Sequence, residues 1–158
     1  MKNAPEARPY LIFSLGQEKF AINVDHVQEV VEVVPITKVP NVPDFMLGII
    51  NLRGRVLPLL DTRVKLNLPK KEVTKKSRIL ILDIPGEDNK NLEIGALVDV
   101  ANEVVSIREA DIQEAPAVEM NKQATPITGL LNDNGDITMI IDISRVFSLQ
   151  DIIQVNNN

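Results

Sequence analysis

Short apolar runs separated by turn residues recur along the whole chain and predict a protein built mainly of β-strands. The predicted strands are 10–15, 20–24, 47–52, 55–60, 78–84, 93–98, 104–107, 127–132 and 136–141. Two pairs of these strands are expected to form hairpins, one about Arg53-Gly54 and one about Asn134-Gly135. Asn-Gly between two apolar runs is among the strongest hairpin signals in a sequence.

Short helices are predicted between some of the strands. A stripe of valines at helical spacing, with Asp25 as the N-cap, predicts one over 25–34. The stripe consists of Val27, Val30, Val31 and Val34. Further helices are predicted after Asp61 and after Asp142, and Asp99 is interpreted as a fourth capping carboxylate.

An internal repeat is the most informative feature of the sequence. Four residues between 48 and 61 recur between 129 and 142, each displaced by 81 positions (129 − 48). The recurring pairs are Gly48 and Gly129, Asn51 and Asn132, Gly54 and Gly135, and Asp61 and Asp142. Upstream, 20–31 resembles 94–105 with a displacement of 74 (94 − 20). The constant spacing favours two related units over a chance similarity of two hairpins.

Two related units of this size predict two small five-stranded β-barrels that pack together, with short helices. A unit of about 70 residues buries only about 60% of its unfolded surface and is marginal alone. We therefore expect the barrels to share a core, to unfold together and to leave a groove at their seam. The predicted organisation is a flexible tail over 1–9, a single domain of two intertwined barrels over 10–149, and a second tail over 150–158.

The composition disfavours catalysis. The chain has no cysteine and a single histidine, His26, which excludes thiolate chemistry and a histidine-rich zinc site. None of the seven glycines stands in the spacing of the common phosphate-binding loops. No apolar run approaches the roughly 20 residues that span a bilayer, so direct membrane insertion is not expected. A binding module without metal or cofactor is the resulting prediction.

The charge of the chain bears on the kind of partner. A formal net charge of −5 argues against nucleic acid, because phosphate binding requires clustered cations. Residues 70–78 contain five cations but no interleaved aromatic residue, and are interpreted as a solvated loop. A small β-barrel that binds nucleic acid or oligosaccharide is the alternative from another functional class. It would need an exposed aromatic platform, whereas the single tyrosine and four phenylalanines stand mostly at core-like positions.

The run from Gly48 to Asp61, GIINLRGRVLPLLD, resembles the signature hairpin of the CheW-like coupling proteins of bacterial chemotaxis. Further stretches similar to the same family are 13–16 with 20–22, 27–30 and 140–143. Together the similarity covers the chain from about Tyr10 to Phe147. The Asn-Leu-Arg-Gly element between two strands is its most specific part, and the joint pattern is stronger than any single piece.

The resemblance implies a fold of two SH3-like barrels and the role of a non-catalytic adaptor in chemotaxis signal transduction. Proteins of this family bind the cytoplasmic tip of a chemoreceptor's helical hairpin and the regulatory domain of the chemotaxis histidine kinase. The resemblance therefore implies a cytoplasmic protein that receptors recruit to the inner face of the membrane. It leaves the kinase-contacting residues unassigned.

The resemblance also implies a receptor-facing groove. Its residues would be Val27, Glu29, Val30, Asn51, Arg53, Ile94 and Val98. The first three would come from the predicted first helix, the next two from the signature hairpin, and the last two from the second barrel. An apolar groove suits an amphipathic helix as partner. Glu29 and Arg53 would contribute orientation more than affinity, because exposed ion pairs are worth roughly 0–1 kcal/mol.

Arg53 is unusual for a hairpin turn, because its repeat-related residue is Asn134. In a type I′ turn both central residues have positive φ, which would cost an arginine on the order of 1 kcal/mol. A type II turn would place only Gly54 at positive φ. In either turn a long cation stands at an exposed tip, which favours a partner contact.

Overall fold

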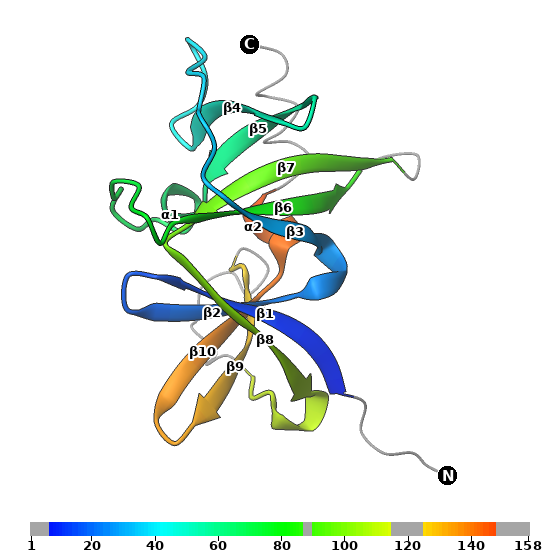
Figure 1. Ribbon diagram of the computed structural model, residues 1–158. Helices are drawn as coiled ribbons and strands as arrows, with labels where there is room; N and C mark the ends of the chain where they lie inside the picture. The colour runs from blue at the N-terminus through cyan, green and yellow to red at the C-terminus, as the bar shows by residue number, and fades with distance from the viewer. Residues whose placement is uncertain (1–6, 87–89, 115–124, 148–158) are drawn as a thin grey trace.

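The computed structural model describes residues 7–86, 90–114 and 125–147 of the chain (Figure 1). This part is mainly β, with ten strands and a few one-turn helices, as the sequence predicts. No helix in the described residues is long and apolar enough to cross a membrane. The predicted tails fall mostly outside the described residues, although the first strand begins at Ala7 rather than at Tyr10.

All nine predicted strands are present, and there is a tenth. The strands are β1 (Ala7–Leu15), β2 (Glu18–Asn23), β3 (Val27–Glu32), β4 (Met46–Leu52), β5 (Arg55–Asp61), β6 (Arg78–Pro85), β7 (Asn91–Val98), β8 (Val100–Arg108), β9 (Ile127–Asp133) and β10 (Asp136–Ile141). The helices are the 3-10 turns η1 (Val24–His26) and η3 (Glu109–Asp111) and the α-helices α1 (Thr62–Lys65) and α2 (Ile143–Val146).

The strands form two five-stranded sheets. The first sheet has the order β8-β1-β2-β10-β9 and the second sheet the order β3-β6-β7-β5-β4. In Figure 1 the second sheet lies above the first. Each sheet takes two strands from one half of the chain and three from the other. Neither half of the repeat therefore contains all the strands of one sheet.

The repeat in the sequence corresponds to a repeat in strand pairing. Leu59 of β5 lies beside Gly95 of β7 in one parallel pair, and Ile140 of β10 lies beside Ala21 of β2 in the other. The displacements of 81 and 74 positions carry the first pair onto the second. The two sheets are thus built on the same plan, which confirms that the repeat is structural.

Each sheet is curled by a contact between its two edges. The segment after β3 bridges β4 through Thr37 and Ile49, and the segment after β8 bridges β9 through Gln113 and Leu130. Apart from these bridges, the two edge strands of each sheet do not pair with each other in the described residues. Each sheet therefore packs in the manner of a small SH3-like barrel that is not fully closed, with an isolated bridge between its edges in place of a ladder of hydrogen bonds.

The core consists of three apolar clusters. The largest lies between the sheets and combines residues such as Leu11 of β1 with Leu80 and Leu82 of β6. A smaller cluster, which includes Ile79 and Ile81, lies on the other face of the second sheet, and a third lies on the first sheet. Strand β6 is buried on both faces, because successive side chains of a strand point to opposite sides. The two sheets share a core, as expected from their size.

The helix predicted over 25–34 is wrong. Only η1 is helical there, and β3 follows it at the edge of the second sheet. Burial alternates along β3, and the strand pairs antiparallel with β6. Valine favours this outcome, because its branched side chain is stiff about χ1 and packs well on a pleated surface.

Two of the four predicted helix caps are confirmed. Asp61 and Asp142 accept hydrogen bonds from backbone N–H groups at the starts of α1 and α2. Asp25 is wrong as a cap, because it lies inside η1 and the capping side chain is that of Asn23. Asp99 is also wrong as a cap, because it lies between β7 and β8 and forms an ion pair instead.

Candidate functional site

All seven residues that the sequence assigned to a receptor-facing groove lie in the second sheet or its hairpin turn. Val27, Glu29 and Val30 are in β3, Asn51 and Arg53 are at the tip of the β4–β5 hairpin, and Ile94 and Val98 are in β7. The prediction that two of them belong to a different barrel from the other five is therefore wrong. They share one sheet, and they do not face one another across the seam.

Ile94 and Val98 are buried in the cluster between the two sheets. Their exposed fractions are 0% and 1%, and both pack with residues of the first sheet. A partner cannot touch side chains at this depth without opening the core. The prediction that they line a groove is corrected: they support the second sheet from within.

Charged side chains and one glutamine gather at one end of the second sheet. We call this set the charged rim, and its members are Gln28, Glu29, Arg53, Arg55, Asp83 and Glu93. The Arg53 Nη2 lies 2.5 Å from the Glu29 Oε2, and the Arg55 Nη2 lies 3.8 Å from the same oxygen. Arg55 also donates to Glu93, and Gln28 donates to Asp83 at 2.6 Å. One glutamate thus lies between two arginines.

The position of the charged rim follows from the alternation of side chains along the strands. Glu29 continues the face of β3 on which Val31 packs against the apolar cluster of the second sheet. Arg55 continues the corresponding face of β5 beyond the buried Leu57. The apolar rows therefore end in charges that remain partly open to solvent, with 63% of the Arg53 side chain and 30% of the Glu29 side chain exposed.

The hairpin turn below Arg53 is of type I′. Arg53 has a φ of 51° and Gly54 a φ of 88°, and the repeat-related Asn134 and Gly135 have almost the same angles, 52° and 91°. The type II alternative is therefore wrong. In the first of these turns, the Asn51 side chain accepts a hydrogen bond from the Gly54 N–H at 2.9 Å. Asn51 thus shapes the turn that presents Arg53.

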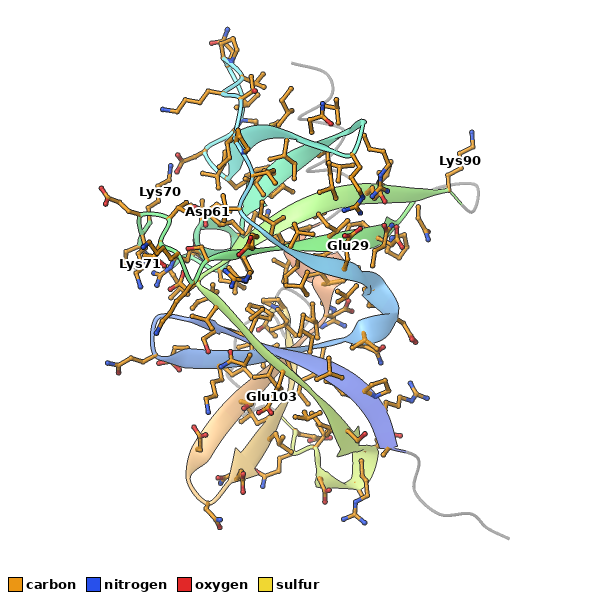
Figure 2. All side chains as sticks on the ribbon, in the orientation of Figure 1. Glu29, Asp61, Lys70, Lys71, Lys90 and Glu103 are labelled. Atoms are coloured by element: carbon orange, nitrogen blue, oxygen red, sulfur yellow. The ribbon has the colours of Figure 1, made fainter. Side chains whose placement is uncertain are left out.

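An apolar side chain, Val30, is exposed on the face of β3 opposite to Glu29. Val30 is 39% exposed, whereas Val27 is half-buried against the cluster between the sheets. Figure 2 shows Glu29 on β3, at the opposite side of the second sheet from Lys70 and Lys71. An exposed sheet edge is one of the surfaces at which proteins bind peptide partners.

The first sheet has a counterpart of the charged rim. Glu103 of β8 corresponds to Glu29, and the pair Lys19 and Asp136 corresponds to Glu93 and Arg55 with the charges exchanged. The Lys19 Nζ lies 2.9 Å from the Asp136 Oδ2, and this hydrogen bond raises the pKa of Lys19. Figure 2 shows Glu103 on the first sheet and Glu29 on the second. The repeat thus places a charged end on each sheet.

A pocket of about 350 Å³ lies at the seam between the sheets, beside α1 and α2. Its lining residues are Glu18, Phe20, Lys65, Leu66, Asn67, Leu68, Pro126, Ile127, Met139, Arg145 and Val146. A hollow at the seam was expected from the sequence. None of the seven predicted receptor-facing residues lines it, so the seam pocket and the charged rim are separate features.

The ion pair between Arg63 and Asp99 was not predicted from the sequence. The Arg63 Nε donates to the Asp99 Oδ1 at 2.9 Å and the Arg63 Nη2 to the Asp99 Oδ2 at 2.5 Å. Only 13% of each side chain is exposed. The hydrogen bonds from Arg63 hold the pKa of Asp99 below its usual value, and the same contact raises the pKa of Arg63. The signal available in the sequence was Asp99 itself, a charged residue directly after the apolar strand 94–98, where it needs a partner.

The buried carboxylates of the described residues take part in structural contacts. Among the described residues, no group of three or more His, Cys, Asp or Glu side chains is placed to hold a metal ion. The carboxylate of Asp61 is buried, which raises its pKa, and it caps α1. The carboxylate of Asp99 is held by Arg63. Both are committed to structural contacts.

Known proteins resemble this chain over most of its length. The sequence model of the CheW-like domain matches residues 9–151. The chemotaxis protein CheW of Bacillus subtilis (strain 168) is 32% identical over 136 residues, which are 86% of this chain and 84% of that protein. The chemotaxis protein CheW of Rhizobium meliloti (strain 1021) is 29% identical over 140 residues, which are 89% and 87% of the two chains.

A solved structure resembles the fold as well. The scaffolding protein TtCheW from Thermoanaerobacter tengcongensis superposes with a TM-score of 0.77 at 32% sequence identity. The similarity covers 92% of this chain and 96% of that one. Sequence and fold therefore agree over both sheets, and the chain belongs to the CheW-like domain family.

Proposed function

We propose that this protein is a non-catalytic adaptor that couples chemoreceptors to the chemotaxis histidine kinase. Its family supports this role, because relatives are named chemotaxis proteins and one solved relative is named a scaffolding protein. The observation that supports it most directly is the charged rim. There Arg53 and Glu29 are partly exposed on one face of the second sheet, and Val30 is exposed on the other face of the edge strand β3.

The receptor-facing surface in this proposal is the charged rim with the adjacent part of β3. Glu29, Val30 and Arg53 contact the helical hairpin at the cytoplasmic tip of the receptor. Val27 and Asn51 hold these groups in place, through the core and through the hairpin turn respectively. The apolar side chain supplies contact area, and the ion pair supplies orientation.

The second partner in this proposal is the regulatory domain of the kinase. We place its contact at the charged end of the first sheet, around Lys19, Glu103 and Asp136, since the repeat makes this end the counterpart of the charged rim. Binding at both ends requires no metal or cofactor. An adaptor of this kind works in the cytoplasm, where receptors recruit it to the inner face of the membrane.

Two charge reversals at opposite ends test the assignment. Arg53→Glu places two carboxylates together and should weaken capture by an immobilised receptor cytoplasmic fragment, while direct binding of the kinase is retained. Lys19→Glu should weaken kinase binding and leave receptor capture intact. Both charges are exposed at the surface, so circular dichroism should show the same fold for both variants. Equal capture of Arg53→Glu and the unaltered protein would contradict the proposed receptor surface.

The alternative of a barrel that binds nucleic acid or oligosaccharide is not favoured. Such a site needs exposed aromatic rings. Phe13, Phe20 and Phe147 are buried, with exposed fractions of 4% or less. The ring of Phe45 is covered by the ammonium group of Lys65, 4.6 Å from the ring centre.

A further inference from the structure

The ion pair between Arg63 and Asp99 joins segments that belong to different sheets. Arg63 is in α1, directly after β5 of the second sheet, and Asp99 lies where the chain crosses from β7 to β8 of the first sheet. The Gly16 N–H, in the turn between β1 and β2 of the first sheet, donates to the Asp99 Oδ2 at 2.7 Å. The Asp99 carboxylate is therefore held from both sheets at once.

The geometry of this contact is directional. Arg63 forms two parallel hydrogen bonds to one carboxylate, and its remaining nitrogen donates to the Pro69 carbonyl at 2.8 Å. Paired bonds of this kind fix the plane of the guanidinium relative to the carboxylate. The apolar cluster between the sheets lacks such directionality, because apolar burial depends on area and hardly on angle. The ion pair thus supplies an orientation that packing alone does not.

The repeat indicates that the fold does not require this contact. The positions that correspond to Arg63 and Asp99 are Ser144 and Asp25. Ser144 donates to Asp142 within the start of α2, and Asp25 is exposed in η1. Among the described residues, no arginine–aspartate pair joins the two sheets at the second crossover, because the pair of Arg145 and Asp142 lies within α2 and its N-cap. A contact present at one crossover and absent from its counterpart points to a purpose other than folding.

We propose that Arg63 and Asp99 are positioning residues that fix the orientation of the two sheets relative to each other. The charged rim lies on the second sheet and its counterpart on the first, so the ion pair sets the angle at which the molecule presents its two ends. The consequence for ternary assembly rests on the function proposed above. The effect of the ion pair on the orientation of the two sheets involves no partner and does not depend on that function.

Distances between spin labels measure the orientation directly. The chain has no cysteine, so single cysteines introduce labels without background. Ser106→Cys in β8 and Glu32→Cys in β3 place exposed labels on different sheets. Ser106→Cys with Asp133→Cys in β9 places both labels on the first sheet. The second pair reports the integrity of one sheet and the first reports the angle between sheets.

The test compares Arg63→Gln with Arg108→Gln. Arg108 also forms two bonds to an aspartate, Asp111, at 3.0 and 3.1 Å, but both residues lie exposed at the end of the first sheet. We expect Arg63→Gln to widen the distribution of distances between sheets and to leave the distribution within the first sheet unchanged. Arg108→Gln should change neither. Arg63→Lys, which keeps the charge but loses the paired geometry, should widen the distribution less and replaces the Gln variant if that one does not fold.

Assembly provides the second readout. Receptor fragment should capture Arg63→Gln as well as it captures the unaltered protein, whereas kinase retained in the ternary complex should fall by about tenfold, within the usual range of coupling between sites. Equal distance distributions for Arg63→Gln and the unaltered protein would overturn the positioning role. Failure of the unaltered protein to bind the receptor fragment would instead overturn the proposed function, and the label distances would still decide the inference.

Discussion

Arg53 combines an unfavourable backbone conformation with a side chain that reaches Glu29. Its φ of 51° lies in the left-handed region, which costs residues other than Gly, Asn and Asp about 1 kcal/mol. The ion pair with Glu29 stabilises the folded protein by at most about 1 kcal/mol, because both side chains are partly exposed. The arginine therefore contributes little to stability, which agrees with a role in recognition.

Replacing Arg53 separates these two effects. Arg53→Asn and Arg53→Ala both remove the ion pair, but only asparagine is suited to positive φ. The Asn variant should be more stable than the Ala variant by about 1 kcal/mol in urea unfolding, and both should bind receptor fragment more weakly than the unaltered protein. Equal stability of the two variants would show that the turn is not strained.

Residue by residue, the exposed charges of the candidate surface were easier to predict than its apolar wall. Glu29 and Arg53 are partly exposed, because a turn tip and an edge strand leave long side chains open to solvent, but their contact with each other was not predicted. Ile94 and Val98 are buried, since the strand that contains them is covered by the first sheet. Apolar residues of a strand give no local sign of which face another sheet covers. Tertiary pairing alone decides that.

Asp99 makes the stability of the protein sensitive to acid. Arg63 lowers the pKa of Asp99 in the folded state, so the unfolded chain binds this proton more readily. The stabilisation is present above the unfolded pKa of about 3.9 and is lost as the pH falls through the folded value. Asp61 has the opposite effect, because burial raises its pKa and protonation relieves the cost of a buried charge.

Asp99→Asn should therefore flatten the acid side of the stability profile. Urea unfolding between neutral pH and about pH 3 should show a smaller loss of unfolding free energy for this variant than for the unaltered protein. At neutral pH the variant should be the less stable of the two. An equal loss on acidification would mean that Asp99 does not contribute through its charge.

At the scale of elements, hairpins were easier to predict than the edge strand β3. Asn-Gly and Arg-Gly turns mark their hairpins locally, and both were placed correctly. In β3 the valines fit helical spacing and strand alternation equally well, as short apolar runs often do. The pairing with β6, some 50 positions away in the sequence (81 − 29), made the segment a strand.

The bridges that curl the two sheets depend on glycine to different degrees. A Cβ on Gly48 would lie 2.3 Å from the backbone oxygen of Thr37, whereas one on Gly129 would lie 2.5 Å from the Ile112 Cγ2 and 3.3 Å from the backbone oxygen of Gln113. The isoleucine methyl can shift by rotation about χ1, at some cost, but a backbone oxygen in a bridge cannot move without opening the bridge. Gly48 also has a φ of 149°, which few other residues adopt.

Gly48→Ala should thus destabilise the protein more than Gly129→Ala. We expect a loss of about 3 kcal/mol or more for the first and about 1 to 2 kcal/mol for the second, measured by urea unfolding. The reverse order would indicate that the bridge at Thr37 can be opened at little cost.

At the scale of the whole molecule, the exchange of strands between sheets links the two halves of the chain. Each sheet needs strands from both halves, and the largest apolar cluster contains residues of both sheets. The repeat predicted two related units, but repeated sequence alone does not show which strands pair. The packing of the complete chain determines which strands pair.

The molecule should accordingly unfold in one step. Amide signals of β1 in the first sheet and β6 in the second should disappear at the same urea concentration. Leu82→Ala, in the cluster between the sheets, should lower that concentration for both strands together, because it removes buried area that they share. Two separate transitions would contradict a shared core.

A three-component capture experiment tests the central claim, that the protein binds two partners at once. Receptor cytoplasmic fragment is immobilised, and kinase and this protein are added together and each alone. We predict that the protein is retained with or without kinase, and that the kinase is retained in quantity only when the protein is present. Kinase retained equally well without the protein, or excluded by its binding, would contradict the account.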